Sequence, residues 1–269
     1  MFRKIARKFK IGSVLLWLRK TRQVLKPNLT KKVYEFSPNQ IKFRKYRSFH
    51  NNQRCFVIGN GPSLKTQDLD KLANEFTFAA NKIYLLFPKT KWRPTYYNIE
   101  DELVARQNND RINQLKGFKK FFRCEFKKIL QQDSDVIWYR DDHQYSPFPQ
   151  FSKNACAGMY WGSSVTYISM QLAYYMGFSK IYLLGVDFDF CSAPTKLANG
   201  SFLSGGEINH FSSDYRKAGE IWNQPNLDIQ LKAYQYAEDF SRKNGFRFFN
   251  ATRGGKLEVF ERVDFDSLF

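Results

Sequence analysis

Short apolar segments that end in glycine or polar residues alternate with helical segments from Arg54 onward, and this alternation limits the chain to few folds. The clearest apolar segments are RCFVIGN (54–60), FTFAAN (76–81) and SKIYLLGVDFDF (179–190). Strands that alternate with helices form a parallel sheet with helices on its faces. The sequence therefore predicts an α/β fold, a parallel sheet with helices on both faces.

Further strands are expected in PTYYNIED (94–101), GFKKFFRCEF (117–126) and FRFFNAT (246–252), and helices in TQDLDKLAN (66–74) and NLDIQLKAYQYAEDFSRKNG (226–245). Thr66 and Asn226 are expected to cap these helices. Residues 154–178 carry no charge, but their glycines, serines and glutamine favour a turn and a buried helix ended by Gly177 over a membrane span.

Composition excludes two other classes of protein. With 27 Phe, 15 Tyr and 5 Trp, the chain has far more apolar surface than a disordered protein carries. Its cysteines form no C-x-x-C pair, which argues against a disulfide framework or a zinc site. We expect a cytosolic protein whose four cysteines are reduced thiols: Cys55, Cys124, Cys156 and Cys191.

The positive charge of the chain is concentrated at its N-terminal end. Residues 1–50 hold 15 Lys and Arg and one acid, Glu35, whereas residues 51–269 hold 28 basic and 24 acidic residues. A nucleic-acid-binding protein usually carries its basic patch on the folded domain. The distribution argues against a nucleic-acid partner and predicts a basic amphipathic arm and linker (1–50) followed by a catalytic domain (51–269).

The first 25 residues mix basic and apolar side chains at an imperfect helical spacing. This pattern is typical of a helix that lies on an anionic membrane surface. The apolar run 11–18 is too short to cross a bilayer, and Arg19 and Lys20 follow it instead of a cleavage site. We expect a cytoplasmic protein, peripheral on the inner face of the cell membrane; a basic helix docked on the protein itself is the alternative.

Residues 59–64, GNGPSL, form a glycine turn between a predicted strand and a predicted helix. Glycines at such a turn let backbone N–H groups approach a phosphate or ribose closely. The turn lacks the Gly-Lys-Ser/Thr of a Walker A loop and the third glycine of the dinucleotide fingerprint. We interpret it as part of a nucleotide site that includes Asn60, Gly61 and Ser63; a plain tight turn is the alternative.

Polar residues also end three other predicted strands: Asn81 ends the second, Asn98 with Glu100 and Asp101 the third, and Asp187 the strand 179–190. Open parallel sheets bind ligands at the carboxyl ends of their strands. Asp187 and Asp189 match the D-x-D pattern that holds a divalent metal in many glycosyltransferases. Three-residue matches are common by chance, so no metal is expected to be required.

Residues 191–225 are rich in Ser, Gly, Asn and Pro and are expected to form a long loop or lid. His210 lies in this segment, where a neutral imidazole is able to accept the proton of a substrate hydroxyl. Asp214 is close enough in sequence to orient His210 or to act as the base itself. A surface histidine bonded to a neighbour is the alternative interpretation.

Several blocks of the sequence resemble known families. In order along residues 54–240, they are GNGPSL, the asparagine-bearing FAANKIY (78–84) and YYNIED (96–101), the block WGSSVTYISMQLAYYMGFSKIYLLGVDF (161–188) and NLDIQ (226–230). They resemble the bacterial sialyltransferases of glycosyltransferase family 42. They look even more like the broader MptE-like superfamily, which includes 6-hydroxymethylpterin pyrophosphokinases and motility accessory factors implicated in nonulosonic acid transfer.

The sialyltransferase resemblance implies a Rossmann-like fold and a metal-independent, inverting transfer from a CMP-activated sugar. By this resemblance, Asn60, Asn81 and Asn98 would contact the cytidine nucleotide and Asp187 would hold the ribose region. The same resemblance implies that two further residues, Gly162 and Ser163, would lie beside the phosphate or the sugar of the donor.

The chain departs from the sialyltransferase pattern in two places. The family has tyrosines just after its G-x-D-F strand, which stabilise the leaving phosphate, whereas Phe188, Phe190 and Cys191 stand here. The family's catalytic histidine aligns ambiguously, because matching NHF with its S-H-Y puts Asp214 instead of His210 at the base position.

The sequence thus favours a membrane-associated glycosyltransferase that uses a CMP-sugar, with sialic acid or another nonulosonic acid as the transferred group. Its expected partners are this donor, a glycan or glycolipid acceptor of surface-glycan assembly and, through residues 1–25, an anionic membrane; a homo-oligomer is left open. No cofactor is expected to be required. The alternative is an ATP-dependent 6-hydroxymethylpterin pyrophosphokinase, which would need Mg²⁺.

Overall fold

The computed structural model describes residues 37–191 and 195–269. The chain divides into two compact units, Met1–Arg44 and Lys45–Phe269. The first unit contributes one described helix, α2 (Pro38–Arg44). The predicted membrane-binding segment, residues 1–25, lies outside the described residues.

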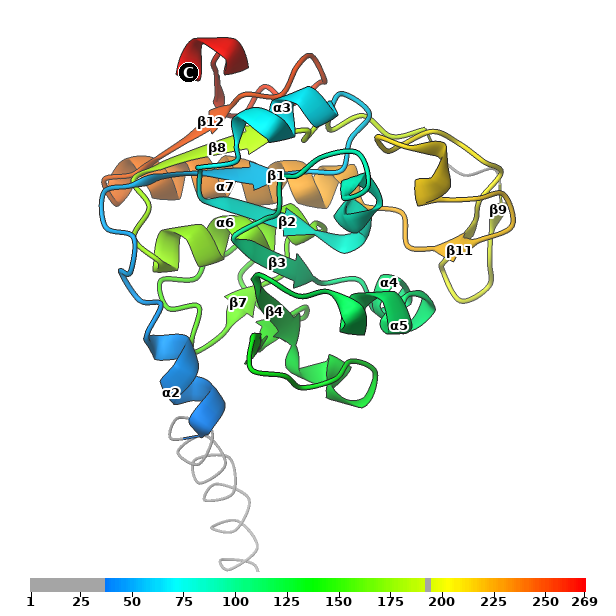
Figure 1. Ribbon diagram of the computed structural model, residues 1–269, viewed down its shortest axis with the longest axis horizontal. Coiled ribbons are helices and arrows are strands. Elements are labelled where there is room, and N and C mark those ends of the chain that lie inside the picture. Colours follow the sequence, from blue (N-terminus) through cyan, green and yellow to red (C-terminus); the bar gives the residue numbers. More distant parts are fainter. Residues whose placement is uncertain (1–36, 192–194) are drawn as a thin grey trace, which may run out of the picture. The chain divides into compact units, whose positions relative to one another are not determined.

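An eight-stranded sheet forms the centre of the second unit (Figure 1). Its order is β13-β12-β8-β1-β2-β3-β4-β5, and each neighbouring pair is parallel. The strands are β1 (Arg54–Ile58), β2 (Thr77–Ala80), β3 (Tyr96–Ile99), β4 (Lys119–Arg123), β5 (Val136–Tyr139), β8 (Lys180–Leu184), β12 (Arg247–Asn250) and β13 (Glu261–Arg262).

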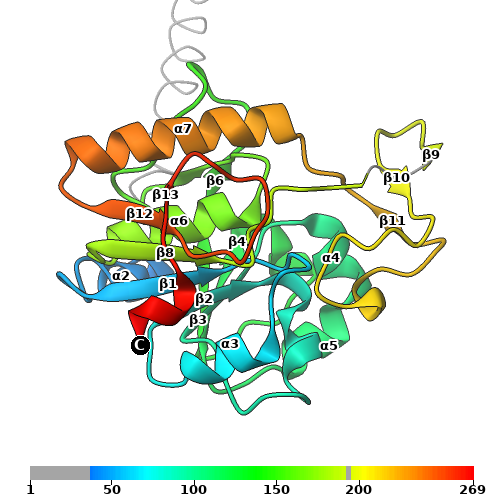
Figure 2. The ribbon, with the colours of Figure 1, turned by 90° about the horizontal axis from the view of Figure 1, so that it is seen from above.

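Helices cover both faces of this sheet (Figure 2). On one face, α6 (Val165–Tyr175) packs against β1, β2 and β3, and α7 (Leu227–Lys243) packs against β12. On the other face lie α3 (Thr66–Lys71), α4 (Glu102–Gln107) and α5 (Asn109–Gln114). The predicted Rossmann-like α/β fold is confirmed.

Local sequence signals explain where the two long helices begin. The Asn226 side chain accepts a hydrogen bond from the Ile229 N–H at 3.1 Å, which confirms the predicted cap of α7. Ser164 caps α6 in the same way, through the N–H of Thr166. Thr66 is the first residue of α3 and not its cap; Lys65 holds that position without a side-chain hydrogen bond.

The segment predicted as a loop or lid contains regular structure. A small antiparallel sheet is formed by three short strands: β9 (Thr195–Lys196), β10 (Phe202–Leu203) and β11 (Ile221–Trp222). One turn of 3-10 helix spans Ser213–Tyr215. Strands of two residues carry too little periodicity to be recognised in a sequence. In Figure 1 this sheet lies beside the end of the central sheet to which the arrowheads of β1 and β3 point.

Smaller elements complete the unit. Strands β6 (Asp141–Asp142) and β7 (Met159–Tyr160) pair with each other. Further turns of 3-10 helix occupy Asn81–Leu86, Cys124–Lys128 and Phe265–Leu268. No helix within the described residues has both the length and the apolar character that crossing a membrane requires.

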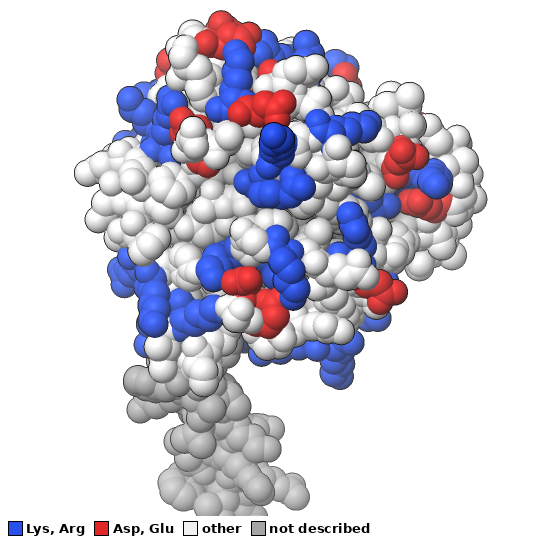
Figure 3. Space-filling model, viewed as in Figure 1, with Lys and Arg blue, Asp and Glu red and all other residues white. Residues whose placement is uncertain are grey.

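The central strands are buried on both sides, which explains their continuous apolar runs. At the surface, basic and acidic side chains lie among one another on the face seen in Figure 3, in keeping with the balanced composition of residues 51–269. Lys120 is among the charged residues that are buried: it is 1% exposed and pairs with Asp133 at 2.6 Å. Against the opposing effect of burial, hydrogen bonds from Lys120 and Lys116 lower the pKa of Asp133 to about 2.

Strand order reverses direction next to β1. From β1 the chain adds β2 to β5 on one side, and it then adds β8, β12 and β13 on the other. The reversal of strand order therefore lies between β1 and β8. In open parallel sheets, ligands bind at this point.

Candidate functional site

A cavity of about 400 Å³ lies at the carboxyl edge of the sheet. Its walls come from the loops after β1 (Gly59–Gly61), β2, β3 and β8 (Gly185–Phe190), from the start of α6 and from the lid. The cavity thus coincides with the reversal of strand order between β1 and β8. This is the size and position expected of a small-molecule site in such a fold.

The glycine turn is pressed against the loop after β8. The N–H of Gly59 donates to the Leu184 carbonyl at 2.7 Å, and the N–H of Gly61 donates to the Gly185 carbonyl at 2.9 Å. A Cβ on Gly59 would overlap the Gly185 carbonyl, and one on Gly61 would overlap the Asp187 carboxylate. These glycines therefore serve close backbone packing, and their own N–H groups are occupied by the protein.

Two of the three predicted asparagines line the cavity with unused acceptors. The Oδ1 atoms of Asn60 and Asn81 are buried and have no hydrogen-bond partner. The amide nitrogen of Asn60 donates to the Ala80 carbonyl at 3.3 Å, so Oδ1 is the unused polar atom of this side chain. Asn98 is 2% exposed, bonds Ser169 at 2.8 Å and does not line the cavity.

Backbone strain is concentrated around the cavity. Asn81, Ser163 and Phe188 adopt positive φ angles of 52°, 59° and 54°, and all three line the cavity. Such angles are uncommon outside glycine, and they gather where surrounding structure fixes a functional geometry. The Asn81 backbone is held by Tyr97, whose hydroxyl donates to its carbonyl at 2.6 Å.

Asp187 and Asp189 both line the cavity but do not form a paired metal site. Strand β8 ends at Leu184, and the left-handed Phe188 between the two acids breaks the alternation that a strand would impose. The Asp187 carboxylate accepts from Ser63 Oγ at 2.9 Å, and burial raises its pKa. Asp189 is exposed and pairs with Lys256 at 3.0 Å.

On the lid, His210 lines the cavity and stacks on Tyr215 with ring centroids 3.7 Å apart. Burial and the nearby charges of Arg216 and Lys82 lower the pKa of His210 to about 3. This value lies well below the ordinary value of about 6.5 on which its predicted basicity rests. Asp214 is exposed and does not line the cavity.

Arg216, Trp222 and Gln230 were not predicted from the sequence, yet each presents an unpartnered polar atom at the cavity. Arg216 lies with its guanidinium carbon 3.5 Å from the Trp222 ring centroid. Trp222 and Gln230 are each 4% exposed, and neither Trp222 Nε1 nor Gln230 Oε1 has a partner. Arg216 and Trp222 belong to no motif, because the tertiary fold of the lid brings them to the cavity. Gln230 lies on α7 and ends the block NLDIQ, whose sequence alone does not indicate that it faces a cavity.

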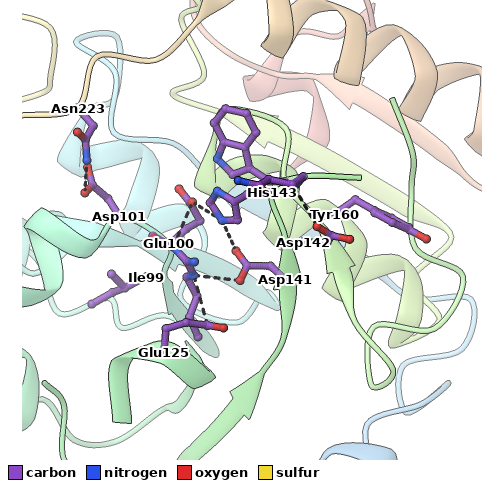
Figure 4. Close-up of polar contacts among 12 residues, drawn as sticks. Ile99, Glu100, Asp101, Glu125, Asp141, Asp142, His143, Tyr160 and Asn223 are labelled. Carbon is purple, nitrogen blue, oxygen red and sulfur yellow. Dashed lines mark hydrogen bonds and ion pairs between the residues drawn. The ribbon is translucent and has the colours of Figure 1, made fainter. Parts of the chain in front are cut away.

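A charged cluster occupies another part of the cavity wall (Figure 4). His143 Nε2 lies 2.8 Å from Asp141 and 3.5 Å from Glu100, and the three ligand atoms that these residues offer lie within 4.8 Å of one another. Arg123 also contacts Asp141 at 2.9 Å and Glu100 at 3.8 Å. Burial and the Asp141 charge raise the pKa of Glu100 to about 7.

Among the described residues, this cluster is the group with enough neighbouring ligand atoms to hold a metal ion. Two carboxylates and one imidazole suit a divalent cation, and Glu100 and His143 both line the cavity. Arg123 already supplies one positive charge to the two acids. The cluster therefore fits either a cation or a closed ion-pair network.

The predicted site residues thus fall into two groups. Those that line the cavity are Asn60, Gly61, Asn81, Ser163, Asp187 and His210. Those that do not are Ser63, Asn98, Gly162 and Asp214. Ser63 nonetheless holds Asp187, and Gly162 packs where a Cβ would overlap the Tyr167 ring, so both support the wall from behind.

Comparison with known proteins gives one finding. No curated protein matches the sequence. A family model described as 6-hydroxymethylpterin diphosphokinase MptE-like matches residues 28–193. This range includes the glycine turn, β1 to β8 and the loop that carries Asp187. The chain therefore belongs to the MptE-like family.

Proposed function

We propose that the protein is a transferase whose donor group arrives on a nucleotide, specifically a CMP-activated sugar, and leaves for a hydroxyl of a glycan acceptor. The observation that carries this proposal is the pair of buried, unpartnered Oδ1 atoms of Asn60 and Asn81 in the cavity. A buried acceptor without a partner is costly, so a ligand that supplies donors is favoured there. The amino group of a base and the hydroxyls of a ribose are such donors.

The resemblance to bacterial sialyltransferases selects cytidine among the nucleotides, because it assigns nucleotide contacts to these same asparagines. Asp187, fixed by Ser63, is suited to accept from ribose hydroxyls. Asn98 and Gly162 do not line the cavity and would instead support the residues that form its wall. The transferred sugar would be a nonulosonic acid such as sialic acid.

His210 is the base that we propose for the acceptor hydroxyl. With its pKa lowered to about 3, its imidazole stays neutral and keeps a free lone pair, but it is a weak base in the ligand-free protein. A bound phosphate would raise this pKa, since a nearby negative charge favours the protonated imidazole. The exposed position of Asp214 makes it the weaker candidate.

Calorimetric titration with CMP, UDP, GDP and ATP, each with and without Mg²⁺, tests the proposal. We expect CMP to bind at one site per chain without Mg²⁺. Asn60→Ala should weaken this binding by about 10-fold or more, because it removes a hydrogen-bond partner in a desolvated site. A failure of CMP to bind, or equal affinity in the folded variant, would refute it.

We propose in addition that residues 1–25 attach the enzyme to anionic membrane, where glycolipid acceptors lie. Each basic residue near such a surface contributes about 1 kcal/mol, and the contribution decreases as salt increases. The full chain should sediment with anionic liposomes at low salt, and a chain lacking residues 1–25 should not. Equal sedimentation of both would remove this part of the proposal.

A second candidate, an ATP-dependent pterin diphosphokinase, is favoured by the cluster of Glu100, Asp141 and His143 and by the description of the family. A divalent cation held there would neutralise nucleotide phosphates. The enzyme would then transfer the terminal diphosphate of ATP to the hydroxymethyl oxygen of a 6-hydroxymethyl pterin, which loses its proton, and release AMP. A Mg²⁺-dependent AMP burst that Glu100→Gln abolishes would establish this activity over the sugar transfer.

A further inference from the structure

The unpartnered polar groups of the cavity have different characters on its two sides. On the turn side, Asn60 and Asn81 offer oxygen acceptors. On the lid side, Arg216 Nη1 and Trp222 Nε1 offer donors, and both atoms are buried without a partner. A ligand that satisfies both sides must carry donors at one end and acceptors at the other.

Arg216 makes no ion pair within 4.0 Å and no hydrogen bond to any described residue. Three acids act on it at longer range: Glu207, Asp101 and Glu220. Glu220 pairs with Lys82 at 3.3 Å, and Asp101 accepts from Asn223 at 3.1 Å. These two acids are therefore committed to other partners.

Glu207 is the remaining acid near Arg216. One of its oxygens accepts from the Gly205 N–H at 2.8 Å, and the other is buried without a partner. A side-chain rotation that paired Glu207 with Arg216 would be the competing explanation for the arginine. Measuring pyrophosphate affinity and urea midpoints in a Glu207→Gln variant separates this explanation from ligand binding.

Arg216 is half-buried, and its Nη1 atom is fully buried without a partner. Desolvation of this part of the guanidinium is unfavourable unless an anion offsets it. The planar guanidinium matches two oxygens of a phosphate or carboxylate, and stacking on the Trp222 ring fixes its plane. The indole N–H adds a donor beside it. We infer that Arg216 and Trp222 form an anion subsite on the lid, which binds a phosphate or carboxylate group of the ligand.

This inference deepens the proposed function, on which it rests for the identity of the ligand. It predicts that the lid recognises the acidic end of the donor while the turn side recognises the nucleoside. Two acidic groups fit this chemistry: the phosphate of the nucleotide and the carboxylate of an acidic sugar. The experiment distinguishes them by adding one group at a time.

Four probes are titrated calorimetrically: inorganic pyrophosphate, cytidine, CMP and CMP-N-acetylneuraminic acid. Three variants accompany the wild type: Arg216→Ala, Arg216→Lys, which keeps the charge but not the fork, and Lys217→Ala, which removes an exposed neighbouring charge. Arg216→Ala should bind pyrophosphate about 10-fold more weakly or worse, as expected for a charge-assisted hydrogen bond. The pyrophosphate affinity of Arg216→Lys should lie between those of the wild type and Arg216→Ala, and the affinity of Lys217→Ala should equal that of the wild type.

Among cytidine, CMP and CMP-N-acetylneuraminic acid, the smallest probe that Arg216→Ala binds more weakly than the wild type identifies the acidic group that Arg216 contacts. A loss between cytidine and CMP assigns the phosphate, and a loss between CMP and CMP-N-acetylneuraminic acid assigns the carboxylate. If pyrophosphate binding depends on Arg216 while no nucleotide binds, the subsite stands and the proposed function fails.

Unchanged affinity for every probe in Arg216→Ala overturns the inference, even where CMP binds. A Glu207→Gln variant identifies the competing explanation. If Arg216 serves only Glu207, both Glu207→Gln and Arg216→Ala should lower the urea midpoint equally and leave pyrophosphate binding unchanged. With a subsite, Glu207→Gln should bind pyrophosphate at least as tightly as the wild type, because a nearby negative charge is removed.

Discussion

On the turn side of the cavity, residues 59–61 continue directly from β1 and bond to carbonyls at the end of β8. On the lid side, Arg216 follows a single turn of 3-10 helix, and Trp222 is the second residue of the two-residue strand β11. Separate bonds join the lid to the rest of the wall. The Phe211 N–H donates to the Asn60 carbonyl at 3.1 Å, and Lys82 Nζ donates to the Tyr215 carbonyl at 2.9 Å and pairs with Glu220 at 3.3 Å. The Gln107 side chain also donates to the Ile221 carbonyl at 2.9 Å.

This difference separates two tasks. Atoms that extend from central parallel strands are fixed before a ligand arrives, so the acceptors of Asn60 and Asn81 are preorganised. A segment of two-residue strands is expected to be less stable locally than the central sheet, which suits a lid that admits a ligand and then excludes water. The turn side is therefore expected to respond to mutation as a rigid wall, and the lid as a movable one.

The largest expected effect is at the turn. Gly59→Ala forces a Cβ against the Gly185 carbonyl, and neither backbone is free to move. It should lower the free energy of unfolding by about 1–3 kcal/mol, measured in urea, and abolish nucleotide binding. The matched lid variant is Gly219→Ala, which meets no atom within 4 Å and only strains a positive φ of 84°. If it costs as much as Gly59→Ala, the rigid-wall account fails.

The next effect separates cavity lining from support. Asn81→Ala should weaken CMP binding by about 10-fold or more, since Asn81 lines the cavity and its Oδ1 has no partner in the protein. Asn98→Ala should leave the affinity within about twofold and instead lower the free energy of unfolding by about 1 kcal/mol, because it loses its bond to Ser169. Calorimetry and urea titration measure the two quantities. The reverse pattern would place the nucleotide elsewhere.

Acid should lower the free energy of unfolding, because His210 takes up a proton more readily in the unfolded chain than in the folded one. Its pKa is about 3 in the folded chain and about 6.5 when unfolded, so between these values the unfolded state binds more protons. Folding stability therefore rises with pH in this window, and a drop from pH 7 to pH 5 should cost about 1–2 kcal/mol. In His210→Gln, urea midpoints should depend less on pH. Identical pH profiles would show that His210 is solvated.

The smallest expected effect is at Asp214. Because its side chain is exposed and outside the cavity, Asp214→Asn should keep turnover within about twofold once the donor is identified. His210→Ala should lower turnover by about 10²-fold or more if it accepts the proton. Steady-state rates of the two variants test this contrast. A large loss in Asp214→Asn alone would transfer the proposed role of base to Asp214.

The same contrast explains what the sequence predicts. Continuous apolar runs identify β1, β2, β3 and β8, and the residues that end them fall at one sheet edge by topology alone. Asn60, Asn81 and Asp187 are recognisable for this reason. Asn98 follows the same rule, but its side chain lies beneath the wall, since alternate residues of a strand face opposite sides of the sheet.

The lid does not follow such a rule. Its two-residue strands have no detectable period, and the pairing of Phe202 with Trp222 joins positions that no motif connects. The low pKa of His210 depends on burial and on charges from Lys82, far away in sequence. The cluster of Glu100, Asp141 and His143 likewise joins the end of β3 to β6 and its following loop. These features depend on tertiary packing alone.

The most direct test of the two-sided cavity is hydrogen exchange of the full chain with and without CMP, followed by mass spectrometry. The account predicts slower exchange in two separate segments, residues 59–64 of the turn and residues 207–223 of the lid. Protection should be larger in the lid, because the turn amides are already bonded to β8. Protection confined to segments outside the cavity, or none at saturating CMP, would contradict the account.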